Sequence, residues 1–129
     1  MTRRFRGMGR GRKVRRTLAR GGTGPAAGLN ERLGALAGVR ISPMFGRWGY
    51  FVGDRLFACF PLRPKEHDLW MRLSPADQAR ALAVAGFRPH RRFAARGWVE
   101  CDVEGPADVA RAIAWLRRAW ASARGEPPA

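Results

Sequence analysis

The sequence predicts an α+β fold: a single two-layer domain in which an antiparallel sheet is packed by a long C-terminal helix and two shorter helices. Three observations support it. Aromatic and β-branched residues flank a glycine turn at Gly53-Asp54, Ser74-Pro75 opens a helix, and an amphipathic stripe runs through residues 106–124. The chain has 129 residues, 46% of them hydrophobic, which is enough for one core without disulfides or metal.

The first expected helix begins near Leu29, with Asn30 as a plausible N-cap. Gly38 can supply the left-handed residue that ends it. Residues 39–42 alternate apolar and polar side chains, which favours a strand, and Pro43 ends or bends that strand.

A β-hairpin is expected over residues 44–60, and it nucleates the sheet. Gly53 at the first central position of a two-residue loop suits a type II′ turn, which requires positive φ there. The apolar runs on either side of the turn prefer a pleated, half-buried surface.

A loop follows over residues 61–68, then a strand over 69–73 and a helix over 75–85. Ser74 is the expected N-cap, Pro75 occupies the first helical position, and Asp77 is the acid three residues after the cap. The apolar residues of this helix predict that it buries Ala79, Leu82 and Ala83.

Residues 87–96, FRPHRRFAAR, interleave basic and aromatic side chains. Two interpretations stay open. The arginines could contact phosphates while the aromatics stack on bases, or the segment is a solvated loop or edge strand whose charges discourage pairing. The candidate nucleic-acid-binding residues here are Arg88, Arg91, Arg92 and Arg96.

Residues 97–103 predict another strand, with Val99, Cys101 and Val103 on one face. Glu100 and Asp102 share the other face, where they either pair with arginines or are solvated. Because the sequence places no histidine beside them, acid-base catalysis is not expected.

The last expected helix covers residues 106–124. Its apolar stripe at 3.6-residue periodicity predicts packing against the sheet, with Trp115 at the margin of the stripe. The stripe consists of Val109, Ala112, Ile113, Leu116, Ala119, Trp120 and Ala123.

The net charge of +15 is concentrated near the N-terminus. Residues 1–28 have few apolar side chains and many glycines, which predicts a disordered basic arm; residues 125–129 are expected to fray. Three interpretations of the arm stay open: contact with a nucleic-acid backbone, charge that is incidental or translated from a start codon placed too early, and a targeting segment. The candidate contacts are Arg3, Arg4, Arg6, Arg10, Arg12, Lys13, Arg15, Arg16 and Arg20.

Few residues suggest a catalytic or metal-binding role. Cys59 and Cys101 are expected to be reduced core residues, and neither histidine, His67 or His90, stands in a catalytic or metal-ligating pattern. No catalytic residue, metal site or cofactor is therefore predicted. Because no apolar run is long enough for a membrane span or signal peptide, a cytoplasmic protein without a membrane partner is expected.

Several motifs in this order resemble the N-terminal domain of the TfoX/Sxy family, with the MmcQ/YjbR domains similar in outline. The resemblance covers residues 29–123, and its expected structural motif positions are Met44, Phe45, Gly46, Gly53, Phe57, Gly97 and Trp98. Arg47 departs from it, since many relatives carry a second glycine there. The chain also ends without the C-terminal helical domain of full-length competence regulators.

The resemblance implies a non-enzymatic bacterial protein of DNA-uptake competence and transcription regulation, acting on DNA or with a transcription-activator protein. Together with the basic arm, it leads to the hypothesis of a nucleic-acid-associated regulator that holds the phosphate backbone non-specifically. The alternative is a protein-protein interaction module with incidental charge. The sequence does not predict the oligomeric state.

Overall fold

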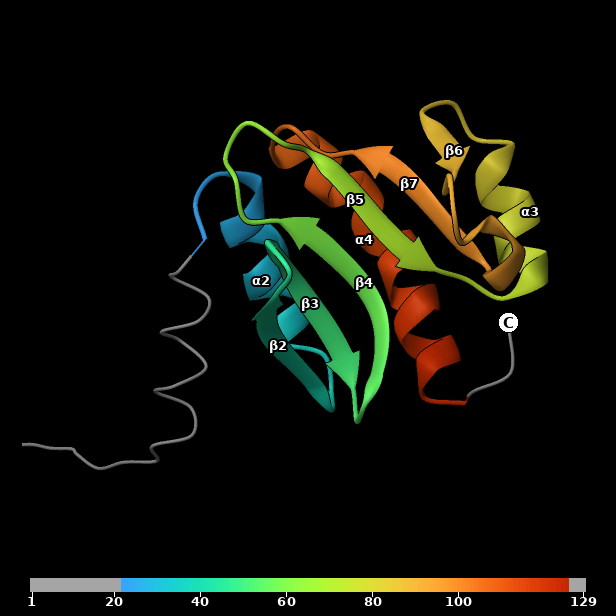
Figure 1. The fold of residues 1–129 in the computed structure, drawn as a ribbon, viewed down its shortest axis with the longest axis horizontal. Helices are drawn as coiled ribbons and strands as arrows, with labels where there is room; N and C mark the ends of the chain where they lie inside the picture. The colour runs from blue at the N-terminus through green and yellow to red at the C-terminus, as the bar shows by residue number, and fades with distance from the viewer. Residues whose placement is uncertain (1–21, 126–129) are drawn as a thin grey trace, which may run out of the picture.

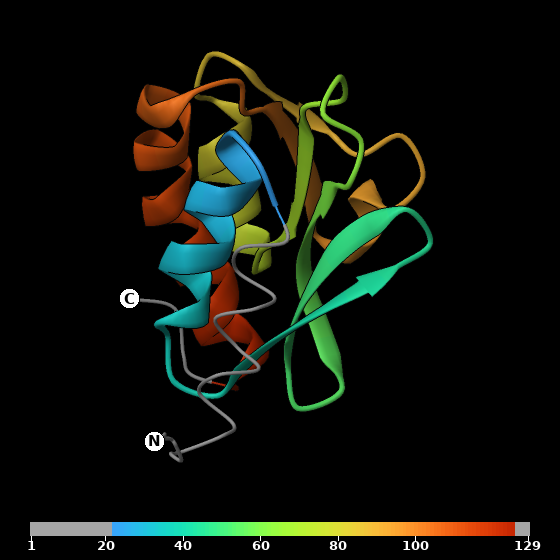
Figure 2. The ribbon, with the colours of Figure 1, turned by 90° about the vertical axis from the view of Figure 1, so that its left-hand side faces the viewer.

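The computed structural model describes residues 22–125, and these form a six-stranded antiparallel sheet with helices on one face (Figures 1 and 2). The predicted α+β fold class is confirmed. The strand order is β2-β3-β4-β5-β7-β6, so β7 is inserted between β5 and β6. The elements are α2 (Pro25–Gly34), β2 (Val39–Met44), β3 (Arg47–Val52), β4 (Arg55–Pro61), β5 (Asp68–Arg72), α3 (Pro75–Leu82), β6 (Phe87–Pro89), a 3₁₀ turn η1 (Ala94–Arg96), β7 (Trp98–Asp102) and α4 (Pro106–Ala123).

Two consecutive hairpins build the first half of the sheet. The predicted hairpin is confirmed as β3 and β4, and Gly53 has the positive φ of 60° that a type II′ turn requires. A second hairpin, which the sequence did not predict, joins β2 to β3 through Phe45 and Gly46. Pro43 does not end β2, because the strand continues to Met44 at the outer edge of the sheet, where a missing N–H is tolerated.

Helix α2 begins four residues earlier than expected, at Pro25, so the prediction of an arm through residue 28 is wrong at its end. Pro25 suits a first helical turn because its fixed φ is helical and its missing N–H has no partner to lose there. Asn30 is not an N-cap. It is buried in the helix, and its side-chain oxygen accepts a hydrogen bond of 2.7 Å from the hydroxyl of Tyr50 in β3.

Helix α3 begins as predicted, with the Ser74 hydroxyl accepting a hydrogen bond from the backbone N–H of Asp77. The predicted buried face is wrong. The helix ends at Leu82, which is exposed, and it buries Ala81 and Asp77 instead. Asp77 can be buried because it forms ion pairs with Arg80 and with Arg118 of α4.

Helix α4 lies against the sheet along its predicted stripe, and most of the stripe is buried. Trp115 is half-buried at the margin, where its ring lies 5.7 Å from the ring of Phe87. The indole N–H of Trp120 donates to the backbone oxygen of Ala37, which fixes the end of α4 to the loop after α2. Within residues 22–125, no helix is both long and apolar enough to span a membrane.

The sheet opens in its middle, between β4 and β5. These strands pair only at Ala58 with Met71 and at Cys59 with Trp70. The register between β3 and β4 shifts at this point, so that Phe57 is the extra residue of a β-bulge. A bulge bends its strand, and β4 accordingly curves away from the end of β5 (Figure 1).

Candidate functional site

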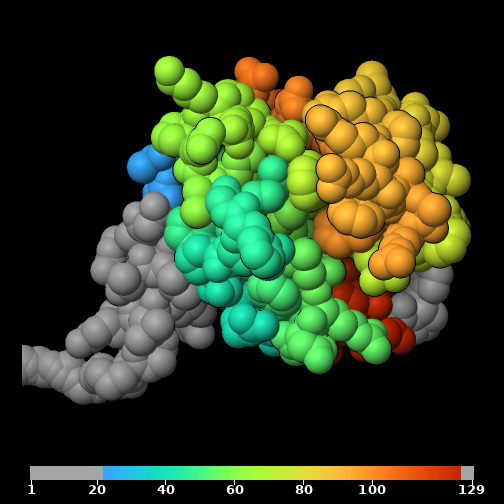
Figure 3. Space-filling model, in the orientation of Figure 1, coloured from blue at the N-terminus to red at the C-terminus, as the bar shows by residue number. Residues whose placement is uncertain are grey.

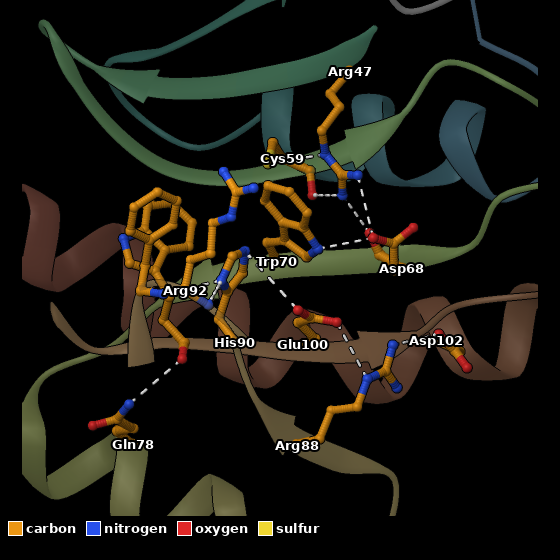
Figure 4. A network of polar contacts seen from close by, with 12 residues as sticks. Arg47, Cys59, Asp68, Trp70, Gln78, Arg88, His90, Arg92, Glu100 and Asp102 are labelled. Carbon is orange, nitrogen blue, oxygen red and sulfur yellow. Dashed lines mark hydrogen bonds and ion pairs between the residues drawn. The ribbon is translucent and has the colours of Figure 1, made fainter. Parts of the chain in front are cut away.

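The predicted nucleic-acid residues do not form one surface in the described part of the chain. Arg3, Arg4, Arg6, Arg10, Arg12, Lys13, Arg15, Arg16 and Arg20 lie outside the described residues. In the second cluster, Arg91, Arg92 and Arg96 are exposed. The Arg88 guanidinium forms ion pairs with two carboxylates: its Nε lies 3.2 Å from Glu100 and its Nη2 lies 3.1 Å from Asp102 (Figure 4). The carboxylate-pairing interpretation is therefore confirmed for Arg88, whose guanidinium is not free for phosphates.

His90 lies beside Glu100, an approach the sequence analysis missed. Both are buried, with 3% and 2% of their surface exposed, on the helix-free face of the sheet. His90 Nε2 lies 3.9 Å from the Glu100 carboxylate. Only the pairing of β6 with β7 brings them together, since they are ten residues apart in the chain. The expectation that no histidine stands near Glu100 is wrong.

One ring nitrogen of His90 has a clear structural role. Nδ1 accepts hydrogen bonds from the backbone N–H groups of Arg92, at 3.0 Å, and Phe93, at 3.1 Å. An accepting Nδ1 carries no proton, so the proton of the neutral ring is on Nε2, which faces Glu100 but has no hydrogen-bond partner among the described residues. Burial lowers the pKa of His90 below its ordinary value, which favours this neutral ring. The His90 ring therefore holds the start of the segment after β6 through Nδ1.

A second cluster on the same face joins β3, β4 and β5. The Arg47 guanidinium lies 3.8 Å from the Trp70 ring centroid, and its Nη1 is 3.3 Å from Asp68. The indole N–H of Trp70 donates to the same carboxylate at 2.8 Å, and Arg47 Nε donates to the sulfur of Cys59 (Figure 4). The Arg47 side chain thus links β3 to β4 and β5. The edge of the Trp70 ring meets His90, so the two clusters are continuous.

A groove of about 710 Å³ lies where β4 and β5 separate. The C-terminal end of α4 forms its floor, visible in Figure 3 as red atoms between the green atoms of β4 and the orange atoms of residues after β6. Ligand sites commonly have volumes of about 300–1,000 Å³, so the groove has the size of a small-molecule site. Its walls are Arg55, Leu56, Phe57, Arg72, Leu73, Ser74, Pro75, Gln78, Ala95, Arg96, Gly97, Ala119, Ser122 and Ala123.

Three arginines from three elements line this groove, which we call the three-arginine groove: Arg55 of β4, Arg72 of β5 and Arg96 of η1. None of them forms an ion pair with a described carboxylate, and no acidic side chain among residues 22–125 lines the groove. The apolar residues Leu56, Ala95 and Ala123 line the groove and keep accessible surface, whereas Phe57, Leu73 and Ala119 are buried behind it. Within the described residues, the site therefore combines positive charge without a counter-charge with apolar wall residues.

The groove wall after β6 is held in place from three sides. The Gln78 side-chain N–H donates to the Ala94 carbonyl at 2.7 Å, and Arg72 Nε donates to the Arg96 carbonyl at 3.0 Å. Gly97 has φ +98°, and an added Cβ would lie 2.3 Å from the Leu73 oxygen. Together with the hydrogen bonds to the His90 ring, these contacts fix the position of the Arg96 backbone, from which the side chain extends.

Metal binding and thiol catalysis have less support in residues 22–125. No group of three or more His, Cys, Asp or Glu side chains there is placed to hold a metal ion. Cys59 and Cys101 are free and buried, and burial raises the pKa of both thiols, that of Cys101 to about 12. Thiols in this state are poor nucleophiles.

Residues 57–119 match the family model described as the Luciferase domain, a match that covers just under half of the chain. No curated protein matches. The matched segment runs from Phe57 to Ala119, both of which line the three-arginine groove, and includes His90 and Glu100. The resemblance to the TfoX/Sxy family is therefore wrong, and the match gives no support to the competence-regulation, transcription-regulation and DNA-binding expectations attached to it. Over the segment that carries most of its groove, this chain is similar to the Luciferase domain family.

Proposed function

We propose that this protein is a small-molecule-binding domain whose ligand occupies the three-arginine groove. The observation that carries the proposal is the groove itself: about 710 Å³ of space where the sheet separates, lined by three arginines that have no carboxylate partner among residues 22–125. Concave sites with an apolar lining and a few convergent polar groups are the usual places for ligands. The buried polar clusters beside the groove support it by fixing one wall.

The proposed role is binding rather than catalysis. Neither His67 nor His90 lines the groove, and the Nδ1 of His90 is occupied by two backbone N–H groups. A general base needs a nitrogen within reach of substrate. The cytoplasm is the proposed location, since two free cysteines suit a reducing compartment.

A groove-filling variant tests the proposal. Ser122 lines the groove from α4, so Ser122→Trp is expected to fill it and leave the helix intact. Ala114 is exposed on the same helix, which makes Ala114→Trp the matched control. The wild-type protein is screened with a fragment mixture by ¹H–¹⁵N NMR. Fragments should shift the amide signals of residues 95 and 97 in wild type and Ala114→Trp but not in Ser122→Trp. The absence of any fragment that shifts these signals would contradict the proposal.

The family match favours a second candidate function, because the matched model carries the name of a light-emitting enzyme. In this case the groove would hold the substrate of such a reaction. Once a ligand is identified, oxygen consumption and light emission in its presence distinguish turnover from binding.

A further inference from the structure

We infer that the ligand of the three-arginine groove is an organic anion: one carboxylate or phosphate group on an apolar body. This inference rests on the proposed function and names the chemical class that the site selects. It follows from the free donors of Arg72 and Arg96, the absence of acidic side chains among the described groove residues, and the apolar residues in the groove wall.

The anionic group belongs at Arg72 and Arg96. Arg72 uses Nε to hold the Arg96 carbonyl, which leaves both of its terminal nitrogens without a partner among the described residues. The Arg96 guanidinium likewise has no described hydrogen-bond partner. Since Arg72 Nε is held against the Arg96 carbonyl, the two residues are neighbours on the rim. A guanidinium with free N–H groups binds carboxylate and phosphate oxygens in a bidentate manner.

The charged side chains along the groove are all cationic among residues 22–125. Ser74 and Pro75, at the start of α3, also line the groove, and Asp77 in the first turn offsets the partial positive charge of that helix end. At the opposite end, Arg55 Nη1 donates to the Ala123 carbonyl at 3.1 Å, which offsets the negative end of α4. The positive potential of the groove therefore comes from its arginines.

The apolar body belongs against the apolar wall residues. Leu56, Ala95 and Ala123 line the groove, keep accessible surface and present no polar side-chain group to a ligand. A free phosphate or acetate would leave most of a 710 Å³ groove unfilled. A neutral or cationic ligand would leave three guanidiniums without counter-charge or meet them with like charge, which costs affinity.

Four matched probes test the inference on the full chain by ¹H–¹⁵N NMR titration at 150 mM salt: 2-naphthoate, 2-naphthyl phosphate, the neutral 2-naphthylmethanol and acetate. The two naphthyl anions should shift the signals of residues 95 and 97, with dissociation constants about tenfold or more below that of the alcohol, because charge-assisted hydrogen bonds are the stronger ones. Whichever naphthyl anion binds more tightly identifies the head group. Acetate should bind more weakly than naphthoate, since it lacks the body.

Two substitutions test where the anionic group of the ligand binds. Arg96→Gln removes an exposed cation with no described partner, so the fold is expected to persist, and Arg72→Gln is the second variant. Each should weaken naphthoate binding about tenfold and leave the alcohol unchanged. Arg117→Gln, on the exposed side of α4, removes the same charge away from the groove and should leave all four constants unchanged.

The outcomes separate the two proposals. If the alcohol binds in the groove as tightly as the anions, the groove is a ligand site but the anion inference is overturned. If no probe shifts the groove signals, both fail. If naphthoate binds equally well to Arg96→Gln, Arg72→Gln and wild type, the anion is held elsewhere and the inference is again overturned.

Discussion

His90 Nε2 and the Glu100 carboxylate lie 3.9 Å apart, and both side chains are buried on the helix-free face of the sheet. The Glu100 carboxylate is held by Arg88, and the His90 ring is held by two backbone N–H groups. The backbone N–H of His90 also donates to the Trp98 carbonyl at 3.2 Å, so His90 ties the turn after β6 to β7. This turn leads to Arg96 at the rim of the three-arginine groove, and its stability is thus a condition for the shape of the site.

The first prediction concerns the loss of folding stability at acidic pH. Burial lowers the pKa of His90, so below pH of about 6.5 the unfolded chain binds a proton more readily than the folded one. This stability term is complete above pH of about 6.5 and is lost as the pH falls toward the folded pKa, by at most about 1.4 kcal/mol per pH unit. Glu100 and Asp68 oppose the loss, whereas Arg91 and Arg47 add to it.

Urea unfolding followed by tryptophan fluorescence at pH 8, 7, 6 and 5.5 measures this loss. In His90→Asn, whose side-chain oxygen can still accept from the backbone N–H groups, the slope between pH 7 and 5.5 should become shallower. His67→Asn changes the other histidine, outside this cluster, and should keep the wild-type slope. Equal slopes in His90→Asn and wild type would show that other groups cause the acid sensitivity.

The second prediction concerns Gly97. An alanine there would have an unfavourable positive φ, and its Cβ would lie 2.3 Å from the Leu73 oxygen. We expect Gly97→Ala to lower the free energy of unfolding by about 2–4 kcal/mol. Gly86 has a similar φ of +94° but open space around it, so Gly86→Ala should cost only about 1–2 kcal/mol. Equal losses, measured by urea unfolding, would mean that the close approach to Leu73 adds nothing.

The third prediction concerns the buried carboxylate of Asp77, which joins α3 to α4. Its Oδ1 lies 3.0 Å from Arg118 Nε. Asp77→Asn leaves Arg118 without its counter-charge, and because Arg118 is partly exposed we expect a loss of about 1–3 kcal/mol rather than the larger cost of a fully buried pair. The exposed turn residue Asp54 offers a control, since Asp54→Asn should change stability by less than about 0.5 kcal/mol.

A double-mutant cycle between Asp77→Asn and Arg118→Gln separates the contribution of the Asp77–Arg118 ion pair from the effect of Asp77 on the N-terminus of α3. The coupling energy should exceed about 0.5 kcal/mol for residues in contact. A coupling energy near zero would show that Asp77 stabilises α3 through its own N-terminus and not through α4.

Local patterns predicted much of this fold. The hairpin at Gly53, the Ser74 cap and the stripe of α4 each depend on residues close in sequence, and all three are confirmed. The start of α2 was missed because Asn30 suits an N-cap by type, whereas its real partner, Tyr50, is twenty residues away.

The groove could not be predicted, because it depends on long-range pairing. Arg55, Arg72 and Arg96 are separated in the chain, and they line one groove because β5 pairs with β7 and because β4 and β5 pair at only two positions. The same holds for His90 and Glu100, which the pairing of β6 with β7 brings together. The sequence suggested Arg96 as a cation for an extended nucleic-acid surface, whereas the structure places it beside Arg72 at a groove.

The last prediction concerns Phe45, which is 97% exposed at the turn between β2 and β3. Both turn residues, Phe45 and Gly46, have positive φ, as in a type I′ turn, which favours Asn-Gly. Phenylalanine is poorly suited to that conformation, and its exposed ring contributes no burial in return. Phe45→Asn should therefore raise the free energy of unfolding by about 0.5–1 kcal/mol in urea unfolding. Phe93→Asn, at φ −116° and against the His90 ring, should give no such gain. A loss of stability in Phe45→Asn would mean that the ring makes a stabilising contact within the folded chain.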